Sequence, residues 1–537
     1  MRVLIVGGYG VFGGRLARLL LKDGVKVIVA GRDLQKAREF TSQFGGDALK
    51  VDVAGDLTPV AKSGARIVVD AAGPFQAYAV DPYRLARFCV ENGISYLDLS
   101  DDAAFTAGIT QLDAPATAAG CFVLSGVSSV PAISAAAVRV LSEGLSELFV
   151  IETSLVPGSR APRGRSVVAS VLSQTGEPLC VWRGSAWRKY HGWSNTKTIS
   201  FGPGFRRRVS LIGAPDLKLF PQAFAAGSVI FRAGLELAIM RWALTTLGFL
   251  RSRHLLPKLT AFLSPILWLS QRLERAGSDR GAMAVEVVGL SDGEPLLRRW
   301  QIVAYHGDGP FIPAVPARAI IRKCASIRPG ARPCLFELSI PDIENALVGL
   351  SVQTNTFRTR APTLFQNALG DRWRELPASV QRLHSVHDIE VFTGKARVTR
   401  GKGLIEHAAA FFFNFPRAGE NVPVTITKTR TAFGEIWERD FGGRKFRSYL
   451  SPSPRPCHYR ERFFVFTYEQ ELPIENGSLF LPVRRGWLLG IPLPGFLLPK
   501  SRAREYDLNG TFHFDVGLYS PLTGQLIVRY EGHFAEE

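Results

Sequence analysis

The first 145 residues alternate between short apolar runs and longer stretches with helical spacing. Helical spacing is found at 11–22 and 82–92. A continuous apolar run lies at 3–6, and further strand-like runs lie at 25–30, 48–53, 66–72, 94–99 and 121–124. Uninterrupted β-branched and aliphatic runs are typical of parallel strands that are covered on both faces. The alternation therefore predicts an α/β domain with a Rossmann-type parallel sheet over residues 1–145.

The pattern becomes mixed over residues 146–355, where strand-like runs occur at 148–155, 166–172 and 284–290. We expect an α+β domain here, of the kind that closes over substrate or forms a dimer. It contains an apolar helical insert at 228–270. Residues 229–250 have nearly the length of a membrane span, but they include Arg232, Glu236 and Arg241. Each such charge costs roughly 3 kcal/mol near the bilayer centre, so no transmembrane helix is predicted. Three alternatives remain for this insert: a hydrophobic lid, a helical pair on a membrane surface, or part of the buried core.

The last third of the chain has short alternating runs punctuated by Gly and Pro. They lie at 408–413, 422–428, 433–439, 444–450, 462–468, 478–481, 510–516 and 525–530. Such runs predict an antiparallel, β-rich and barrel-like domain over 363–537. Three aromatic residues are expected in its core or in the wall of a cavity: Trp437, Trp487 and Phe496. A more specific hypothesis is that this cavity holds a lipid.

Length and charge narrow the classes of protein. The 537 residues exceed one ordinary core, so two or three domains are expected. The net charge of +18 is spread along the chain, without zinc-ligand spacing or an aromatic RNA signature, which argues against nucleic acid. Anionic lipid headgroups or an acidic substrate explain the charge at least as well.

The cysteines and the start of the sequence bear on localisation. Six cysteines without a CxxC, and a strand at the very start, favour a cytoplasmic protein with free thiols. The inner face of the membrane is a second expected location.

The clearest chemical signal is a glycine turn between the first strand and the first helix. Gly8, Gly10 and Gly13 have the G-x-G-x-x-G spacing. This spacing gives a tight turn, lets backbone approach a pyrophosphate and lets the helix pack closely on the strand. The turn predicts a dinucleotide site; a purely structural turn is the alternative.

The end of the second strand bears on which dinucleotide binds. An NAD site usually has a carboxylate there, whereas this strand ends in Gly31-Arg32-Asp33. Arg32 can reach a 2′-phosphate, which favours NADP, with NAD as the alternative. In the competing interpretation Arg32 is solvated and Asp33 only caps the next helix.

Catalytic groups are harder to identify. Tyr78, Tyr96 and Asp98 are weak candidates for proton transfer, and no Tyr-x-x-x-Lys pair or metal-ligand cluster is present. A Gly-x-Ser-x-Gly match around Ser291 is more typical of an ordinary turn than of a hydrolase nucleophile.

Several motifs together resemble the saccharopine dehydrogenase-like reductases. They are the turn at 8–13, Gly31-Arg32, the loop 72–75, Tyr96-Leu-Asp98 and the segment 126–134. The resemblance covers about the first 140 residues and implies NADP, with its nicotinamide end near 73–75 and 126–131. No counterpart of the amino-acid-binding residues is found, so only the reductase class carries over. Loops at 277–281, 307–310 and 312–316 are similar to loops in an uncharacterised bacterial branch of this family, and the resemblance implies that they lie at the cleft. Asp279 and Arg280 are then candidates for holding a polar substrate group; a turn with an exposed salt bridge is the alternative.

The C-terminal part resembles an uncharacterised bacterial domain, DUF4166, through the segments 443–446, 487–494 and 514–516.

For the whole chain, the prediction is an NADP-dependent oxidoreductase that reduces a C=O, C=N or C=C bond of a hydrophobic or acyl small molecule. The alternative is a non-catalytic NADP sensor whose C-terminal domain binds lipid or protein. The partners to be expected, besides the small molecule, are a membrane surface that is contacted peripherally and a second copy of the chain. The expected cofactor-binding residues are Gly7, Gly8, Tyr9, Gly10, Val11, Phe12, Gly13, Arg32, Asp52, Ala72, Gly73 and Pro74. The expected substrate residues are Ser129, Asp279 and Arg280.

Overall fold

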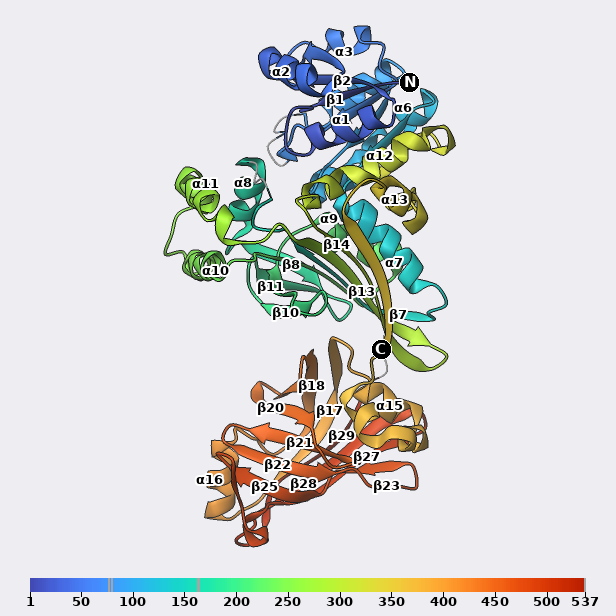
Figure 1. Ribbon diagram of the computed structural model, residues 1–537. Coiled ribbons are helices and arrows are strands. Elements are labelled where there is room, and N and C mark those ends of the chain that lie inside the picture. The colour runs from blue at the N-terminus through green and yellow to red at the C-terminus, as the bar shows by residue number, and fades with distance from the viewer. Residues whose placement is uncertain (76–77, 79–80, 162–164, 536–537) are drawn as a thin grey trace. The chain divides into compact units, whose positions relative to one another are not determined.

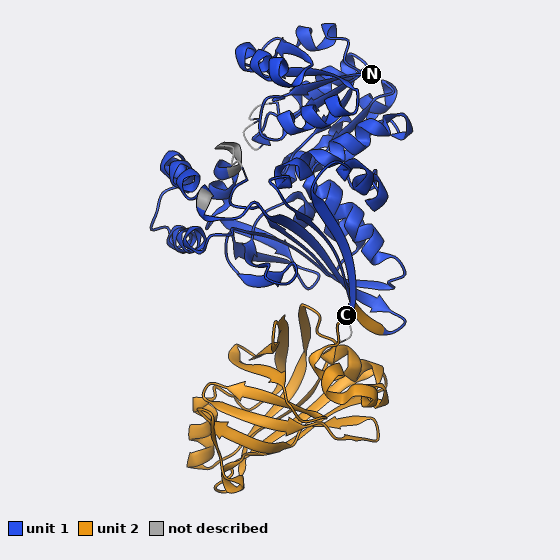
Figure 2. Ribbon diagram, viewed as in Figure 1, with its two compact units in different colours: residues 1–293, 297–359 blue, residues 294–296, 360–537 orange. Residues whose placement is uncertain are grey.

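The computed structural model describes residues 1–75, 78, 81–161 and 165–535, and these fold into two compact units (Figures 1 and 2). Unit 1 holds Met1–Gly293 and Leu297–Thr359, and unit 2 holds Glu294–Leu296 and Arg360–Glu537. Residues 162–164, inside the predicted middle domain, and residues 536–537 lie outside the described part.

Unit 1 contains a seven-stranded parallel sheet, six strands of which overlap the predicted strand-like runs. Its order is β15-β6-β5-β4-β1-β2-β3. The strands are β1 (Arg2–Val6), β2 (Lys26–Gly31), β3 (Asp47–Lys50), β4 (Ile67–Asp70), β5 (Ser95–Asp98), β6 (Phe122–Ser125) and β15 (Gly330–Pro333). The helices are α1 (Gly13–Lys22), α2 (Leu34–Phe44), α3 (Thr58–Lys62), α4 (Arg84–Glu91), α5 (Ala103–Gly108), α6 (Asp113–Ala118) and α7 (Ser134–Ser142). The central strands are almost wholly buried, because helices cover both faces.

The last strand of this sheet corrects the expected boundaries. β15 pairs in parallel with β6, so the chain returns to the first sheet after the middle domain. Helices α12 (Val315–Arg322) and α13 (Ile340–Leu347) lie beside that sheet (Figure 1). Residues 146–355 are therefore not one continuous domain, and they share one compact unit with residues 1–145.

A mixed sheet follows in the middle of the chain, with order β10-β11-β12-β7-β13-β14-β16 and with β8 and β9 at its side. The strands are β7 (Glu147–Val156), β8 (Pro178–Trp182), β9 (Trp187–His191), β10 (Lys197–Ser200), β11 (Arg206–Leu211), β12 (Ser228–Gly234), β13 (Gly281–Ser291), β14 (Glu294–Ala304) and β16 (Val352–Arg360). Its helices are α8 (Arg165–Gln174), α9 (Pro215–Phe224), α10 (Ala238–Ser252) and α11 (Leu263–Arg272).

Two expectations for this region are wrong. The run 166–172 lies in helix α8 and not in a strand. The insert 228–270 is not wholly helical, because its first seven residues form β12, where Arg232 is buried and bonded to Glu152. No helix of the described residues is long and apolar enough to cross a membrane.

Unit 2 is built on a single antiparallel sheet of 13 strands, with order β23-β24-β27-β28-β29-β17-β18-β19-β20-β21-β22-β25-β26. The sheet curves around its own core (Figure 1). The strands are β17 (Ile389–Arg400), β18 (Gly419–Thr431), β19 (Gly434–Phe441), β20 (Arg444–Pro452), β21 (His458–Phe463), β22 (Phe466–Glu471), β23 (Ile474–Glu475), β24 (Ser478–Phe480), β25 (Val483–Leu488), β26 (Ile491–Pro492), β27 (Lys500–Leu508), β28 (Thr511–Tyr519) and β29 (Leu526–Phe534).

Helices α14 (Leu364–Leu369) and α15 (Ala378–His384) add Phe365 and Leu383 to the core of unit 2. The antiparallel β-rich prediction is confirmed. One expected run is wrong: residues 408–412 lie in helix α16 (Leu404–Phe412).

Candidate functional site

The glycine turn joins three parts of the first sheet at very short range. Gly7 has a φ of +73°, and a Cβ there would lie 2.7 Å from the carbonyl oxygen of Ala71. A Cβ on Gly13 would collide with the carbonyl oxygen of Gly7. Glycine is therefore required where β1, the loop after β4 and the start of α1 meet.

The start of α1 also presents unpaired donors. The backbone N–H groups of Val11, Phe12 and Gly13 make no hydrogen bond with any other residue in the described ranges. The first turn of a helix carries such free donors at the positive end of its dipole. This is the arrangement that binds a phosphate group.

A cleft of about 720 Å³ opens beside this turn, within the range of small-molecule sites. Four segments line it: the glycine turn, the end of β2, and the loops after β3 and β4. The predicted cofactor residues among its lining are Gly7, Tyr9, Gly10, Arg32, Asp52, Ala72, Gly73 and Pro74. The other predicted residues, Gly8, Val11, Phe12 and Gly13, lie in the turn and at the start of α1. The fold thus brings four segments that are separate in the sequence, with predicted cofactor residues among them, around one cleft.

The end of β2 separates the roles of Arg32 and Asp33. Asp33 caps α2, and its Oδ1 accepts hydrogen bonds from the backbone N–H groups of Gln35 (3.0 Å) and Lys36 (3.2 Å). Arg32 is exposed, lines the cleft, and has no hydrogen bond or ion pair with the described residues. The capping role weighed for Asp33 is therefore confirmed, and the guanidinium of Arg32 is available to an anion.

Tyr9 connects the glycine turn to the end of β2. Its hydroxyl accepts a hydrogen bond of 3.2 Å from the backbone N–H of Asp33. Its ring lies so close to Gly31 that a Cβ there would be 2.5 Å from the ring. Tyr9 therefore fixes the wall of the cleft next to Arg32.

Arg84 is a cleft residue that the motifs do not reveal. Its Nη2 donates to the carbonyl oxygen of Gly55 at 2.7 Å, and its Nη1 donates to that of Val53. These bonds hold the loop after β3, which carries Asp52. The available signal is an arginine in the first turn of a helix, where the dipole disfavours positive charge unless another partner compensates.

Of the three candidates for proton transfer, Tyr78 alone lines the cleft. Its hydroxyl donates to the carboxylate of Asp70, at 3.2 Å from Oδ1 and 3.1 Å from Oδ2. Tyr96 is buried behind it, with its hydroxyl 3.4 Å from Asp70. Burial raises the pKa of Asp70 to about 6, although hydrogen bonds from Ala72, Tyr78 and Tyr96 oppose the shift.

Asp98 is enclosed at the end of β5. It accepts hydrogen bonds from the backbone N–H groups of Gly126 (2.8 Å) and Ser100 (3.0 Å) and from the hydroxyl of Ser125 (2.9 Å). Burial raises the pKa of Asp98 to about 7. Asp98 therefore fixes the loop after β6 and does not reach the cleft.

The expected substrate residues are not brought to the cleft lining. Ser129 is buried at the start of the short helix η3 (Ser129–Ile133), which follows β6. Asp279 and Arg280 precede β13, and the guanidinium of Arg280 lies 5.6 Å from the centre of the Tyr305 ring. Ser291 ends β13 at a turn that leads into β14, so the strand–turn–helix context of a hydrolase nucleophile is missing. Across the described residues, no cluster of His, Cys, Asp and Glu could hold a metal ion.

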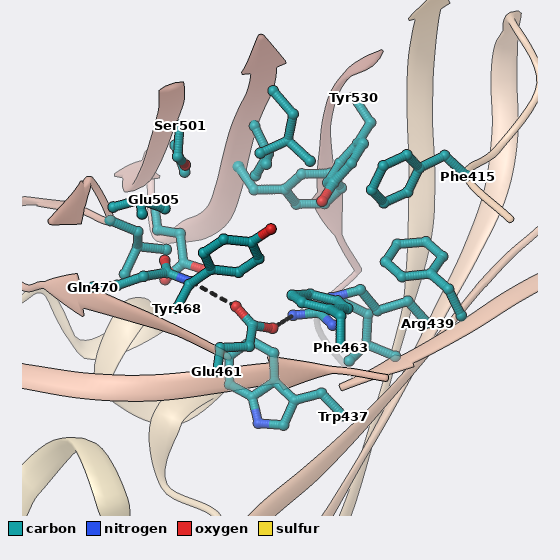
Figure 3. A pocket seen from close by; sticks show the side chains of 18 of the residues that line it. Phe415, Trp437, Arg439, Glu461, Phe463, Tyr468, Gln470, Ser501, Glu505 and Tyr530 are labelled. Atoms are coloured by element: carbon teal, nitrogen blue, oxygen red, sulfur yellow. Dashed lines mark hydrogen bonds and ion pairs between the residues drawn. The ribbon is translucent and has the colours of Figure 1, made fainter. Parts of the chain in front are cut away.

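A second cavity, of about 150 Å³, lies inside the curved sheet of unit 2 (Figure 3). Its wall is mainly aromatic and aliphatic, and it includes Trp437, as predicted. The prediction for Phe496 is wrong, since this side chain is 73% exposed. Glu505 also lines the cavity, and its Oε2 lies 2.6 Å from His384 Nε2.

Comparison with known proteins confirms both resemblances. Residues 3–124 match the Saccharopine dehydrogenase NADP binding domain, and residues 376–534 match a domain of unknown function, DUF4166. None of the curated proteins searched matches the chain.

Among solved structures, the chain is similar to saccharopine dehydrogenase (L-Glu forming) from Saccharomyces cerevisiae. The identity is 14% and the TM-score 0.48, with 66% of this chain and 99% of that chain covered. It is also similar to a probable dehydrogenase from Thermotoga maritima. That identity is 10% and the TM-score 0.33, with 65% of this chain and 93% of that chain covered. The domain match and the cleft together support a nicotinamide-dinucleotide-dependent oxidoreductase.

Proposed function

We propose that unit 1 is an NADP-dependent reductase that acts on a C=O, C=N or C=C bond of a hydrophobic or acyl substrate. The observation that carries the cofactor choice is the end of β2. Arg32 is exposed there, lines the cleft and has no partner among the described residues, while the next residue, Asp33, caps α2 with its carboxylate. A guanidinium matches a phosphate in charge and geometry, whereas a ribose hydroxyl requires an acceptor.

The residues present fit the dinucleotide. The free N–H groups at the start of α1 would hold the pyrophosphate, and Arg32 would hold the 2′-phosphate. NADPH supplies the hydride when bound, and this chain's residues supply position and electrostatics.

Tyr78 has a positioning role in this proposal. Its hydroxyl proton is already shared with Asp70. Giving that proton to a substrate would leave a phenolate beside a carboxylate in a buried setting, where like charges repel strongly. Burial raises the pKa of Tyr78, with the charge of Asp70 adding to the shift, which also opposes loss of the proton.

The test is a titration of the full chain with NADPH and NADH, repeated with Arg32→Ala. Loss of a charge-assisted phosphate contact should weaken NADPH binding about 10- to 100-fold and leave NADH little changed. Arg38→Ala is the matched control, because Arg38 is exposed on α2 and does not line the cleft. Equal loss of both nucleotides, or no effect, would refute the assignment of Arg32. Tight NADPH binding without oxidation by any hydrophobic carbonyl compound would favour the sensor alternative.

The hydrophobic substrate class is supported by an apolar surface in the same unit, on α10, α11 and the segment between them. Exposed side chains on it include Ile239 (63%), Trp242 (65%), Leu255 (67%) and Trp268 (58%). Residues 237–273 contain five Lys or Arg residues and no Asp or Glu. Exposed tryptophans among basic residues are typical of helices that lie on an anionic bilayer, where each basic residue adds about 1 kcal/mol of attraction. We propose that this surface rests on such a membrane and receives substrate from it.

Cosedimentation with vesicles tests this contact. The chain should bind phosphatidylcholine vesicles that contain phosphatidylglycerol, bind pure phosphatidylcholine less, and be released by salt. Trp242→Ser with Trp268→Ser should reduce the binding. Trp187→Ser is the matched control, since Trp187 is 52% exposed on β9 and lies outside residues 237–273. Binding that ignores lipid charge, or that the control reduces equally, would refute the contact.

A further inference from the structure

The cavity inside unit 2 is small and mostly apolar. Its volume of about 150 Å³ is similar to that of apolar protein cavities that hold one benzene molecule. Phe415, Phe446, Phe514 and Ile527 are among the side chains that line it. A long acyl chain does not fit in this volume, so the lipid considered from the sequence is too large for the cavity.

The charged groups at the cavity already have partners. Arg439 donates to the hydroxyl of Ser448 (2.9 Å) and to Glu461 Oε1 (3.1 Å). Glu461 Oε2 accepts from Gln470 Nε2 (2.7 Å), and Gln470 Oε1 accepts from the hydroxyl of Tyr459 (2.9 Å). A charged ligand would have to disrupt this buried network, and breaking a buried ion pair is strongly destabilising. The cavity therefore favours an uncharged ligand.

Two tyrosine hydroxyls at the cavity have no hydrogen-bond partner among the described residues. Tyr530 is 8% exposed and lines the cavity, and its hydroxyl has no hydrogen bond with any residue in the described part of unit 2. Tyr468, on strand β22, also lines the cavity, and its hydroxyl likewise has no hydrogen bond with any described residue. Both side chains lie around the space that Arg439 and Glu461 border (Figure 3). Burial raises the pKa of each tyrosine to about 12, so each hydroxyl is a neutral donor.

Buried tyrosine hydroxyls usually have a partner, because an unmade hydrogen bond in an apolar setting is costly. A ligand oxygen can provide that partner where the protein does not. We propose that this cavity binds a small uncharged molecule, one ring or a short branched chain in size, whose carbonyl or hydroxyl oxygen accepts a hydrogen bond from Tyr530. The hydroxyl of Tyr468 is a second donor at the cavity.

Fluorine NMR titration of the full chain tests the proposal with two probes of similar shape. They are 4-fluoroacetophenone, which carries a carbonyl oxygen, and 4-fluorotoluene, which does not. The ketone should bind more tightly. Tyr530→Phe removes one oxygen atom and should weaken the ketone about fivefold, the loss expected for one neutral hydrogen bond, while leaving the fluorotoluene unchanged.

Two further variants complete the test. Tyr506→Phe is the matched control, because Tyr506 stacks on His513 and does not line the cavity, and it should bind both probes as the wild type does. Ala503→Phe fills the space from β27 and should abolish binding of both probes. Failure of the wild type to bind the ketone would overturn the proposal, as would a ketone affinity that Tyr530→Phe leaves unchanged. NADPH affinity should be the same in every variant, which separates this outcome from that of the cofactor proposal.

Discussion

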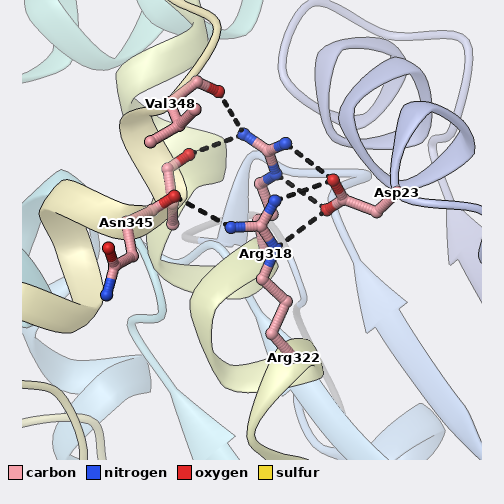
Figure 4. Close-up of polar contacts among 6 residues, drawn as sticks. Asp23, Arg318, Arg322, Asn345 and Val348 are labelled. Carbon is pink, nitrogen blue, oxygen red and sulfur yellow. Dashed lines mark hydrogen bonds and ion pairs between the residues drawn. The ribbon is translucent and has the colours of Figure 1, made fainter.

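Replacing Asp23 with alanine should loosen helix α12 from the first sheet. Asp23 caps the end of α1 and accepts four hydrogen bonds from α12 (Figure 4). Its Oδ1 accepts from Nη2 of Arg318 and of Arg322, both at 2.7 Å, and its Oδ2 accepts from their Nε atoms at 2.8 and 3.1 Å. Arg318 is 5% exposed, so the variant would leave a buried guanidinium without its carboxylate.

The expected magnitude can be worked out in two ways. Burial alone would raise the pKa of Asp23, but Arg318 and Arg322 outweigh it and hold the pKa at about 2, against an ordinary value of 3.8. That difference corresponds to about 2.5 kcal/mol. Breaking a buried ion pair costs about 3–5 kcal/mol. Arg318 keeps its bonds to the carbonyl oxygens of Ala346 and Val348, which favours the lower figure, so we expect a loss of about 2–3 kcal/mol.

Hydrogen exchange of the α12 amides measures this loss directly as a lower free energy of local opening. Asp47→Ala is the control, because Asp47 is exposed and has no ion pair within the described residues. The pH dependence has a definite sign. Because the pKa of Asp23 is depressed in the folded chain, its contribution is fully present above about pH 4 and is lost as the pH falls toward 2. The reasoning is refuted if the variant changes α12 exchange no more than the control does.

Three further predictions concern single side chains. Gly13→Ala should abolish NADPH binding in a titration, because its Cβ would collide with the turn, whereas Gly55→Ala, whose Cβ would meet nothing closer than 3.4 Å, should not. Tyr9→Phe removes the acceptor for the backbone N–H at the start of α2 and should weaken NADPH binding about fivefold by the same titration; an unchanged affinity would contradict a role for this hydroxyl in the cleft wall. Burial lowers the pKa of Lys428 to about 7, against an ordinary pKa of 10.5. Between pH 7 and pH 10.5 Lys428 is therefore protonated to a larger extent in the unfolded chain than in the folded one. The free energy of unfolding of unit 2 should rise with pH over that range. Urea unfolding at pH 7 and pH 9 should show this rise in the wild type and not in Lys428→Met; a rise in both would exclude Lys428 as its source.

The glycine turn was predictable because its requirements are local. A strand, three spaced glycines and a helix follow one another within 22 residues, and each has its own sequence signal. The strand β15 has no such signal. Gly330–Pro333 contains no apolar run, and it becomes a strand only by pairing with β6, which a reading along the chain cannot foresee.

Helix α8 shows a different kind of failure. Its valines favour a strand by propensity, but Val168 and Leu172 are both buried, four residues apart, as on one face of a helix. The cavity of unit 2 was beyond prediction for a third reason. Tyr468, Tyr530 and Arg439 come from three strands, and which side chains meet depends on register and curvature. The sequence could only indicate an antiparallel sheet with aromatic side chains inside it.

The two buried carboxyl groups beneath the cleft show why a shifted pKa does not by itself mark a catalytic group. The pKa of Asp70 is raised to about 6 and that of Asp98 to about 7, and burial is the largest cause in both. Such values are often found in catalytic acids and bases. Here, however, hydrogen bonds from the backbone N–H groups of Ala72 and Gly126 engage these carboxyl groups, and neither residue lines the cleft. Each ends a central strand and fixes the loop that follows it. The carboxyl groups are therefore better explained as positioning residues, which hold the loops after β4 and β6 at the edge of the sheet where the dinucleotide is proposed to bind.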